Sequence, residues 1–258
     1  MTAKPTDTGP NRTGIAVSPK QSKEAIESAR EGVPVDSHDT GAHHRSAVAV
    51  ARDSEPLGTA PPPASPKGLA KTLLEKAKGN QPTVFLDAIG ERIAFERTGV
   101  RLYEALLCRF DASHPHAGSP SRGDLERIRD EELAHFQMLC DAMRKMGGDP
   151  TAITPSADVV AVASMGISAV LDDPRCTLTE GLKAILIAEL ADNDSWAMLC
   201  SLADDLGQDE LAENFRNALA DEEEHLASVR SWLKATVEGQ LGVAPSAGAR
   251  PEPSQPGA

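Results

Sequence analysis

The central part of the chain repeats apolar positions at steps of three and four residues, the period of an amphipathic helix. Four long segments follow this pattern and predict helices over residues 82–110, 121–146, 179–206 and 208–241. Gly147-Gly148 and Gly207 follow two of these segments, as glycine often does where a helix ends. Shorter apolar segments predict a lead-in helix at residues 69–78 and a further short helix at residues 157–171.

The connections between the four long helices are unequal in length. About ten residues join the first pair, about thirty the middle pair, and a tight glycine turn the last pair. Short, long and short connections are typical of two helical hairpins joined by one crossover. The sequence therefore predicts an all-α fold, a ferritin-like antiparallel four-helix bundle of two hairpins with a long crossover.

The two ends of the chain differ in composition from the bundle. Residues 1–66 are rich in Pro, Ser, Thr, Gly and charged residues, and they predict a largely irregular arm that is mobile or drapes over the surface. One helix is predicted within it at residues 18–31, with Ser18 as N-cap and Pro19 in the first turn. The bundle is expected at residues 67–241 and a disordered tail at residues 242–258.

Composition and charge narrow the range of partners. The net charge of −13 disfavours nucleic acids and anionic membrane surfaces. No apolar run approaches the ~20 residues of a membrane span, and the N-terminus lacks the apolar segment of a signal peptide. We therefore expect a cytoplasmic protein without nucleic-acid or membrane partners. The four cysteines form no CxxC pair, so a zinc-ribbon or rubredoxin-like module is excluded.

Each predicted hairpin carries the same residues in the same order inside its apolar stripes. A glutamate is followed seven residues later by an aromatic residue, and the next helix carries a Glu-x-x-His pair. Both spacings keep the residues on one helix face. The first hairpin has Glu96, Tyr103, Glu132 and His135, and the second has Glu189, Trp196, Glu222 and His225.

Four carboxylates on interior faces require compensation. Each would cost several kcal/mol if it were ionised and unpaired, whereas a whole domain is stable by only ~5–15 kcal/mol. The apolar stripes contain two imidazoles, but the pattern places no Lys or Arg inside them where it could pair with the glutamates. Two divalent cations would balance four carboxylates, so the pattern predicts a two-metal site.

These residues resemble the ferritin-like superfamily of di-iron and di-manganese carboxylate proteins, which includes rubrerythrins, bacterioferritins and manganese catalases. The resemblance extends over about residues 82–241. It implies two divalent metal ions per chain, with iron expected ahead of manganese. It implies terminal ligands Glu96 and Glu189, bridging ligands Glu132 and Glu222, and one histidine for each ion, His135 and His225.

The resemblance also assigns roles around the ions. Glu131 and Asp221 each precede a ligand glutamate, as in the EExxH and DExxH pairs of acyl-carrier-protein desaturases, where the preceding acid supports a histidine. They could equally be solvated surface acids. Tyr103 could donate a hydrogen bond or an electron to the centre, or could serve in packing alone. Gly99, one turn from Glu96, could open an access path or allow close helix packing.

The expected function is that of an oxidoreductase acting on O2 or H2O2, as a peroxidase, ferroxidase or catalase-like enzyme, in oxidative stress or iron handling. Without CxxC pairs, a reductive cycle needs an external electron donor. The alternative is a non-catalytic module for metal storage, delivery or sensing, and a third reading is a structural bundle with vestigial ligands. Self-association would be in keeping with such bundles.

Overall fold

The structure, a computed structural model, describes residues 9–11, 13–31, 37–63, 66, 68, 81–113 and 117–242. Among these residues it contains helices and no strand, which confirms the all-α prediction. The predicted lead-in helix at residues 69–78 and the tail beyond residue 242 lie outside the described residues. Contacts divide the chain into two units, residues 4–58 and the chain from residue 59 onward, which are described separately below.

The unit of residues 4–58 contains two α-helices and a short 3₁₀ turn among its described residues, η1 (Ile15–Val17), α1 (Pro19–Arg30) and α2 (Ser37–Asp53). Helix α1 begins as predicted, with Ser18 in an extended conformation and Pro19 in the first turn. Helix α2 was not predicted, because its apolar residues gather in its second half and give no helical stripe. The predicted boundary at residues 66 and 67 stays a prediction.

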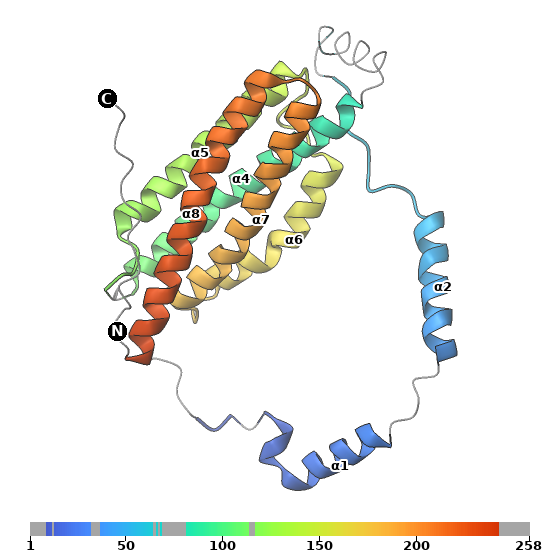
Figure 1. Cartoon of the computed structure of the whole chain (residues 1–258), viewed down its shortest axis with the longest axis vertical. Helices are drawn as coiled ribbons and strands as arrows, with labels where there is room; N and C mark the ends of the chain where they lie inside the picture. Colours follow the sequence, from blue (N-terminus) through green and yellow to red (C-terminus); the bar gives the residue numbers. More distant parts are fainter. Residues whose placement is uncertain are drawn as a thin grey trace. The chain divides into compact units, whose positions relative to one another are not determined.

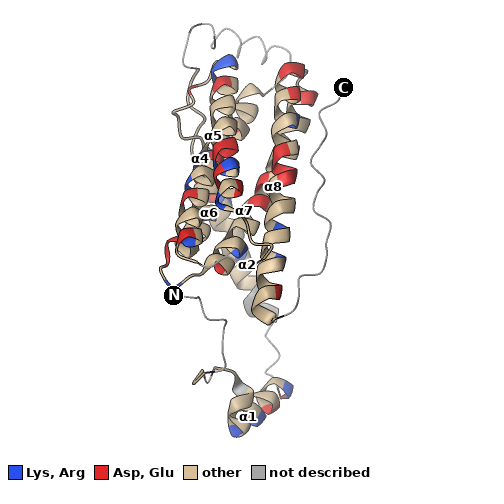
Figure 2. Ribbon diagram, turned by 90° about the vertical axis from the view of Figure 1, so that its left-hand side faces the viewer, with Lys and Arg blue, Asp and Glu red and all other residues tan. Residues whose placement is uncertain are grey.

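The other unit contains α4 (Pro82–Asp111), α5 (Arg122–Lys145), α6 (Pro155–Asp172), α7 (Leu178–Asp205) and α8 (Asp209–Leu241). Their bounds lie within two residues of the predicted ones. Helix α4 packs along α5 and helix α7 along α8, while α4 also contacts α7 (Figure 1). Acidic residues recur along α8, in keeping with the negative charge of the chain (Figure 2).

Local signals account for where these helices begin and end. The Ser121 hydroxyl accepts a hydrogen bond from the Asp124 backbone N–H, and the Asp124 carboxylate accepts one from the Ser121 N–H, which together form a capping box at α5. Gly207, between α7 and α8, has a φ of +61°, a left-handed conformation that glycine adopts without steric cost.

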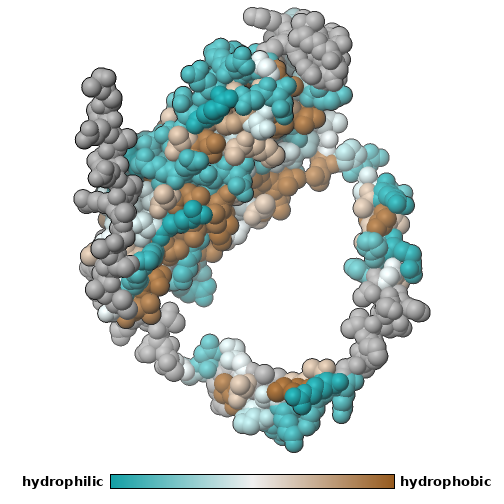
Figure 3. All heavy atoms as spheres, viewed as in Figure 1, coloured by the Kyte–Doolittle hydropathy of each residue, from teal (hydrophilic) through white to brown (hydrophobic). Residues whose placement is uncertain are grey.

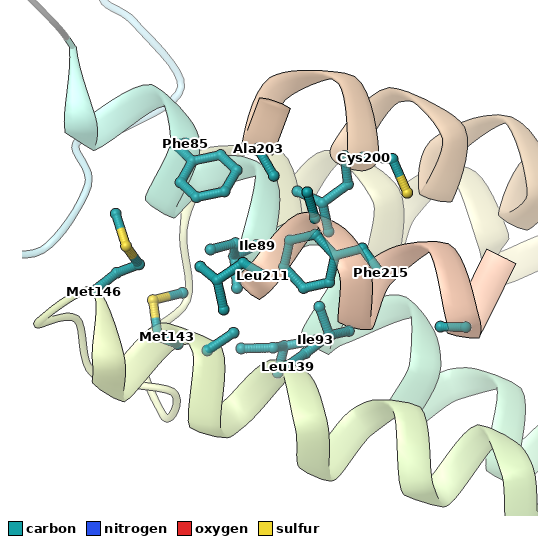
Figure 4. Packing of buried hydrophobic residues seen from close by; sticks show 14 of the residues in the cluster. Phe85, Ile89, Ile93, Leu139, Met143, Met146, Cys200, Ala203, Leu211 and Phe215 are labelled. Atoms are coloured by element: carbon teal, nitrogen blue, oxygen red, sulfur yellow. The ribbon is translucent and has the colours of Figure 1, made fainter. Parts of the chain in front are cut away.

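Two apolar clusters contain residues of α4, α5, α7 and α8, one toward each end of the helices. The first cluster includes Phe85, Ile89, Leu139, Ala203 and Phe215 (Figure 4). The second includes Leu102, Leu106, Ile128, Ile185 and Val229. Along α4 and α8 the chain passes the first cluster before the second, and along α5 and α7 it passes them in reverse order. A layer of buried polar residues lies between the clusters.

Helix α6 connects the two pairs of helices and packs against α4 and α7. Its outer side exposes apolar residues such as Val159, Val162 and Met165, and brown spheres mark this side of the domain (Figure 3). Among the described residues it is the helix that is long and apolar enough, by length and composition, to cross a membrane, over 18 residues. This segment did not stand out in the sequence as a continuous apolar run, because polar residues interrupt it. Core helices of soluble proteins meet the same test, but they are mostly buried, whereas 22% of this segment is buried.

Candidate metal centre

The six residues predicted as ligands lie together in the buried polar layer. They come from α4, α5, α7 and α8, and none is more than 5% exposed. Helical spacing puts each Glu-x-x-His pair on one face, and the apolar clusters on both sides keep water away. The six residues are Glu96, Glu132, His135, Glu189, Glu222 and His225.

Glu222 lies between the two imidazoles. His135 Nδ1 is 2.8 Å from Glu222 Oε1, and His225 Nδ1 is 3.2 Å from Glu222 Oε2. The ring centroids of the two histidines are 6.2 Å apart. Both rings therefore turn Nδ1 toward the carboxylates, with one Glu222 oxygen facing each ring.

The outer nitrogens of the two rings meet the acids that precede the ligand glutamates. His225 Nε2 lies 2.8 Å from Glu131 Oε2, and His135 Nε2 lies 3.3 Å from Asp221 Oδ2. Each contact crosses from one Glu-x-x-His helix to the other. An acceptor at Nε2 favours the tautomer that carries its proton there, which leaves the Nδ1 lone pair facing inward.

The two aromatic residues of the repeat also support each other's glutamates. The Tyr103 hydroxyl donates a hydrogen bond to Glu189, and the Trp196 indole N–H donates one to Glu96 Oε1 at 2.9 Å. Tyr103 is 1% exposed and Trp196 is fully buried. Each aromatic residue, seven positions after its own glutamate, therefore binds the glutamate of the other helix, so that Tyr103 and Glu96 of α4 pair with Glu189 and Trp196 of α7.

One prediction about this layer was wrong, because a basic residue does reach the interior. Arg92 is 2% exposed and forms ion pairs with Glu96 and with Asp192. Its guanidinium carbon lies 4.8 Å from the centre of the Phe95 ring and 5.4 Å from that of Trp196. The signal in the sequence was its position four residues before Glu96, which puts it on the same helix face. Arginine is usually exposed, so the pattern gave it no weight.

Asp192 is a second residue that the sequence pattern missed. It is 1% exposed and lies on α7, three residues after Glu189 and on the same face. The layer thus contains five buried carboxylates and one buried guanidinium. With neutral imidazoles the formal charge is four negative, which two divalent cations would still balance.

Gly99 makes room for a carboxylate. A Cβ atom built at Gly99 would lie 2.1 Å from Glu132 Oε2 and 2.7 Å from Glu132 Cδ. Glu132 could not occupy its position if this residue of α4 had a side chain. Of the two readings of Gly99, the geometry favours close packing over an access path.

Comparison with known families gives one match. Residues 124–237 match the family model named ferritin-like domain. The chain contains a ferritin-like domain. No curated protein and no solved structure matches the chain. The matched segment includes five of the six predicted ligands, and Glu96, with Arg92 and Tyr103, precedes it on α4.

The buried side chains form three overlapping groups that could hold a metal ion. Nitrogen and oxygen atoms of Glu132, Glu189, Glu222 and His225 lie within 4.8 Å of one another, and so do those of Glu96, His135 and Glu222 and those of Glu96, Glu132, Asp192 and Glu222. Eight buried side-chain atoms of the described residues have no hydrogen-bond partner, and five of them belong to the six predicted ligands. The five atoms are Glu96 Oε2, Glu132 Oε2, His135 Nδ1, Glu189 Oε2 and Glu222 Oε1.

Without metal, the electrostatics of this layer favour bound protons. Burial and the charge of Glu222 raise the pKa of Glu132, and the same two causes raise the pKa of Glu189 to about 8. Burial alone would lower the pKa of His225, but Glu131 and Glu222 raise it to about 10. For His135, Glu222 and Glu96 likewise outweigh burial and raise the pKa to about 10. Protons thus compensate the carboxylates where cations would otherwise do so.

Proposed function

We propose that this chain is a di-metal carboxylate protein that holds two divalent ions and acts as an oxidoreductase on O2 or H2O2. We expect these ions to be iron, with manganese as the alternative. Ferritin-like domains typically bind metal ions, and the buried carboxylate and imidazole groups could hold them. We further propose that α4, α5, α7 and α8 form the antiparallel four-helix bundle of two hairpins. The chain directions through the two apolar clusters support this arrangement.

The observation that carries the proposal is the set of buried oxygen and nitrogen atoms that could bind a metal ion and that have no hydrogen-bond partner. His135 Nδ1 lies 2.8 Å from Glu222 Oε1, yet neither atom has a hydrogen bond of acceptable geometry. An unsatisfied buried polar atom costs ~1–3 kcal/mol, so several in one layer would be a large burden for the fold. A cation between such atoms would satisfy them, because it accepts lone pairs from carboxylate oxygens and from a deprotonated imidazole nitrogen.

The residues around the ligands would keep the ligand atoms in position. Glu131 and Asp221 hold the two imidazoles at Nε2, and Tyr103 and Trp196 hold Glu189 and Glu96. When bound, the metal pair would supply electrons and Lewis acidity for the reduction of O2 or H2O2. The Tyr103 hydroxyl can hold a proton at Glu189, and the apolar clusters exclude bulk water. An external donor would return electrons, since the chain has no CxxC pair.

The second candidate is a non-catalytic module for storage, delivery or sensing. The separate unit of residues 4–58 favours it, because a helical segment outside the metal-binding domain could contact a partner.

We also propose a cytoplasmic location, a role in oxidative stress or iron handling, and self-association. Ferritin-like domains are generally soluble, which agrees with a cytoplasmic location.

The first experiment measures metal per chain in protein produced with added iron and manganese. We expect about two ions per chain, and the element bound separates iron-based chemistry from a manganese catalase. Ferrous protein is then mixed with excess H2O2. Continued consumption supports the enzyme, and one event per site supports the non-catalytic module.

A matched pair of variants tests the site itself. Glu222→Ala should lose at least one ion, because Glu222 faces both imidazoles. Glu223→Ala changes the exposed neighbour on the same helix and should keep two. If Glu222→Ala kept two ions and full activity, the assignment of the site would be wrong.

A further inference from the structure

Arg92 places a permanent positive charge at one side of the candidate metal centre. The guanidinium stays protonated at any pH at which the protein is folded. It is 2% exposed and forms ion pairs with Glu96, a predicted ligand, and with Asp192, which is not one. Its charge is therefore poorly screened and acts directly on the ligand set.

Three overlapping groups of side chains could each hold an ion: two contain a histidine, and the third joins Glu96 and Glu222 to Glu132 and Asp192. The group around His225 has three carboxylates, Glu132, Glu189 and Glu222, and we call it the His225 position. The group around His135 has two carboxylates, Glu96 and Glu222, and we call it the His135 position. Arg92 pairs with a ligand of the His135 position. At the His225 position the corresponding glutamate, Glu189, accepts a hydrogen bond from the uncharged Tyr103 instead.

We propose that the ion pair between Arg92 and Glu96 makes the two metal positions unequal, so that the His135 position binds a divalent cation more weakly than the His225 position. This inference rests on the proposed two-metal function. Arg92 competes with the ion for Glu96 and repels it, whereas Glu189 at the His225 position pairs with the uncharged Tyr103. Asp192 pairs with the guanidinium and balances part of its positive charge, so it lessens the difference in affinity that Arg92 creates.

The order of binding is tested by titrating the metal-free, full-length protein with Mn²⁺ in equilibrium dialysis. The wild type should bind two ions in separate steps. His135→Ala should keep the tighter step within about threefold and lose the weaker one, because it removes the weaker position. His225→Ala should lose the tighter step. Two equal steps in the wild type, or the reverse assignment in the variants, would overturn the proposal.

The role of Arg92 is tested in the same assay. Arg92→Gln should strengthen the weaker step by about tenfold or more, because it removes the competing charge and leaves Asp192 unpaired. Arg92→Lys keeps the charge and should keep two separated steps. Arg97→Gln, which changes an exposed arginine on the same helix, should change neither step. An unchanged or weakened second step in folded Arg92→Gln would contradict the proposal.

A second variant covers the case in which Arg92→Gln does not fold. Asp192→Asn preserves side-chain volume and leaves Arg92 with Glu96 as its remaining ion-pair partner. It should weaken the second step and leave the first within about threefold. An unchanged second step in this variant would also overturn the proposal. Failure of the underlying function looks different, because the wild type would then bind no Mn²⁺ at all.

Discussion

His225 Nε2 lies 2.8 Å from Glu131 Oε2, a contact that joins α8 to α5 at the edge of the buried layer. Glu131 is itself held by Arg127, whose Nη1 lies 2.6 Å from the same oxygen. The equivalent contact in the other half, between His135 and Asp221, is longer at 3.3 Å, and Asp221 is 53% exposed. The same kind of contact thus supports both histidines, but the contact at His225 is shorter and its carboxylate is held by an arginine.

Glu131→Gln should therefore weaken metal binding more than Asp221→Asn. We expect a loss of about 10- to 100-fold in affinity for Glu131→Gln and a smaller loss for Asp221→Asn. Equilibrium dialysis with Mn²⁺ measures both, and Asp130→Asn, at an exposed neighbouring acid, is the control. Equal affinity in Glu131→Gln and wild type would mean that Glu131 is only a surface acid.

Tyr103→Phe tests the hydrogen bond to Glu189. It removes one hydroxyl with little change in volume and leaves a Glu189 oxygen without its donor. The metal-free protein should lose about 1–3 kcal/mol of unfolding free energy. The metal-loaded protein should lose less, because the ions hold Glu189 in place. Urea unfolding with and without Mn²⁺ measures the difference, and equal losses in both forms would argue for a packing role alone.

Gly99→Ala should disturb the centre through Glu132. The new Cβ would lie 2.1 Å from Glu132 Oε2, so the carboxylate must move. We expect a loss of about 1–3 kcal/mol in stability from overpacking, together with weaker metal binding. Gly166→Ala is the matched control, since a Cβ at this α6 position meets nothing within 4 Å. It should gain about 0.5–1 kcal/mol from helix propensity. Similar effects of the two changes on metal binding would contradict the role of Gly99.

The metal-free protein should become less stable as pH rises. The pKa of both His135 and His225 is raised from 6.5 to about 10, so between these values the folded state holds protons that the unfolded state has released. Their contribution is fully present below pH 6.5 and is lost as pH rises toward 10. Glu189, raised from 4.5 to about 8, acts in the same direction over its own range.

Melting temperatures of the metal-free protein between pH 6.5 and 9 test this expectation. They should fall, whereas the increase on adding Mn²⁺ should grow with pH, because metal binding requires deprotonated ligands. A melting temperature of the metal-free protein that rises over this range would show that the imidazoles are not protonated in the folded state.

The helices could be predicted because their periodicity is local. The stripe of apolar residues and the glycines that follow it gave the bounds of α4, α5, α7 and α8 within two residues. The spacing of Glu96 and Tyr103, which Glu189 and Trp196 repeat, can likewise be found in the sequence alone. Acidic residues inside apolar stripes indicate that positive charge must balance them. These features follow from helix geometry and the cost of burying charge, which require no knowledge of the partner helix.

Contacts between helices needed the tertiary structure. Whether Arg92 lies inside depended on Asp192 of α7, a hundred residues away, because a buried guanidinium is tolerated only where another helix supplies a counter-charge. The pairing of Tyr103 with Glu189, and of Trp196 with Glu96, likewise joins α4 to α7. The sequence by itself determined the helices and the acidic interior. Only the packing of α4 against α7 decided that Arg92 supplies a positive charge inside the acidic layer.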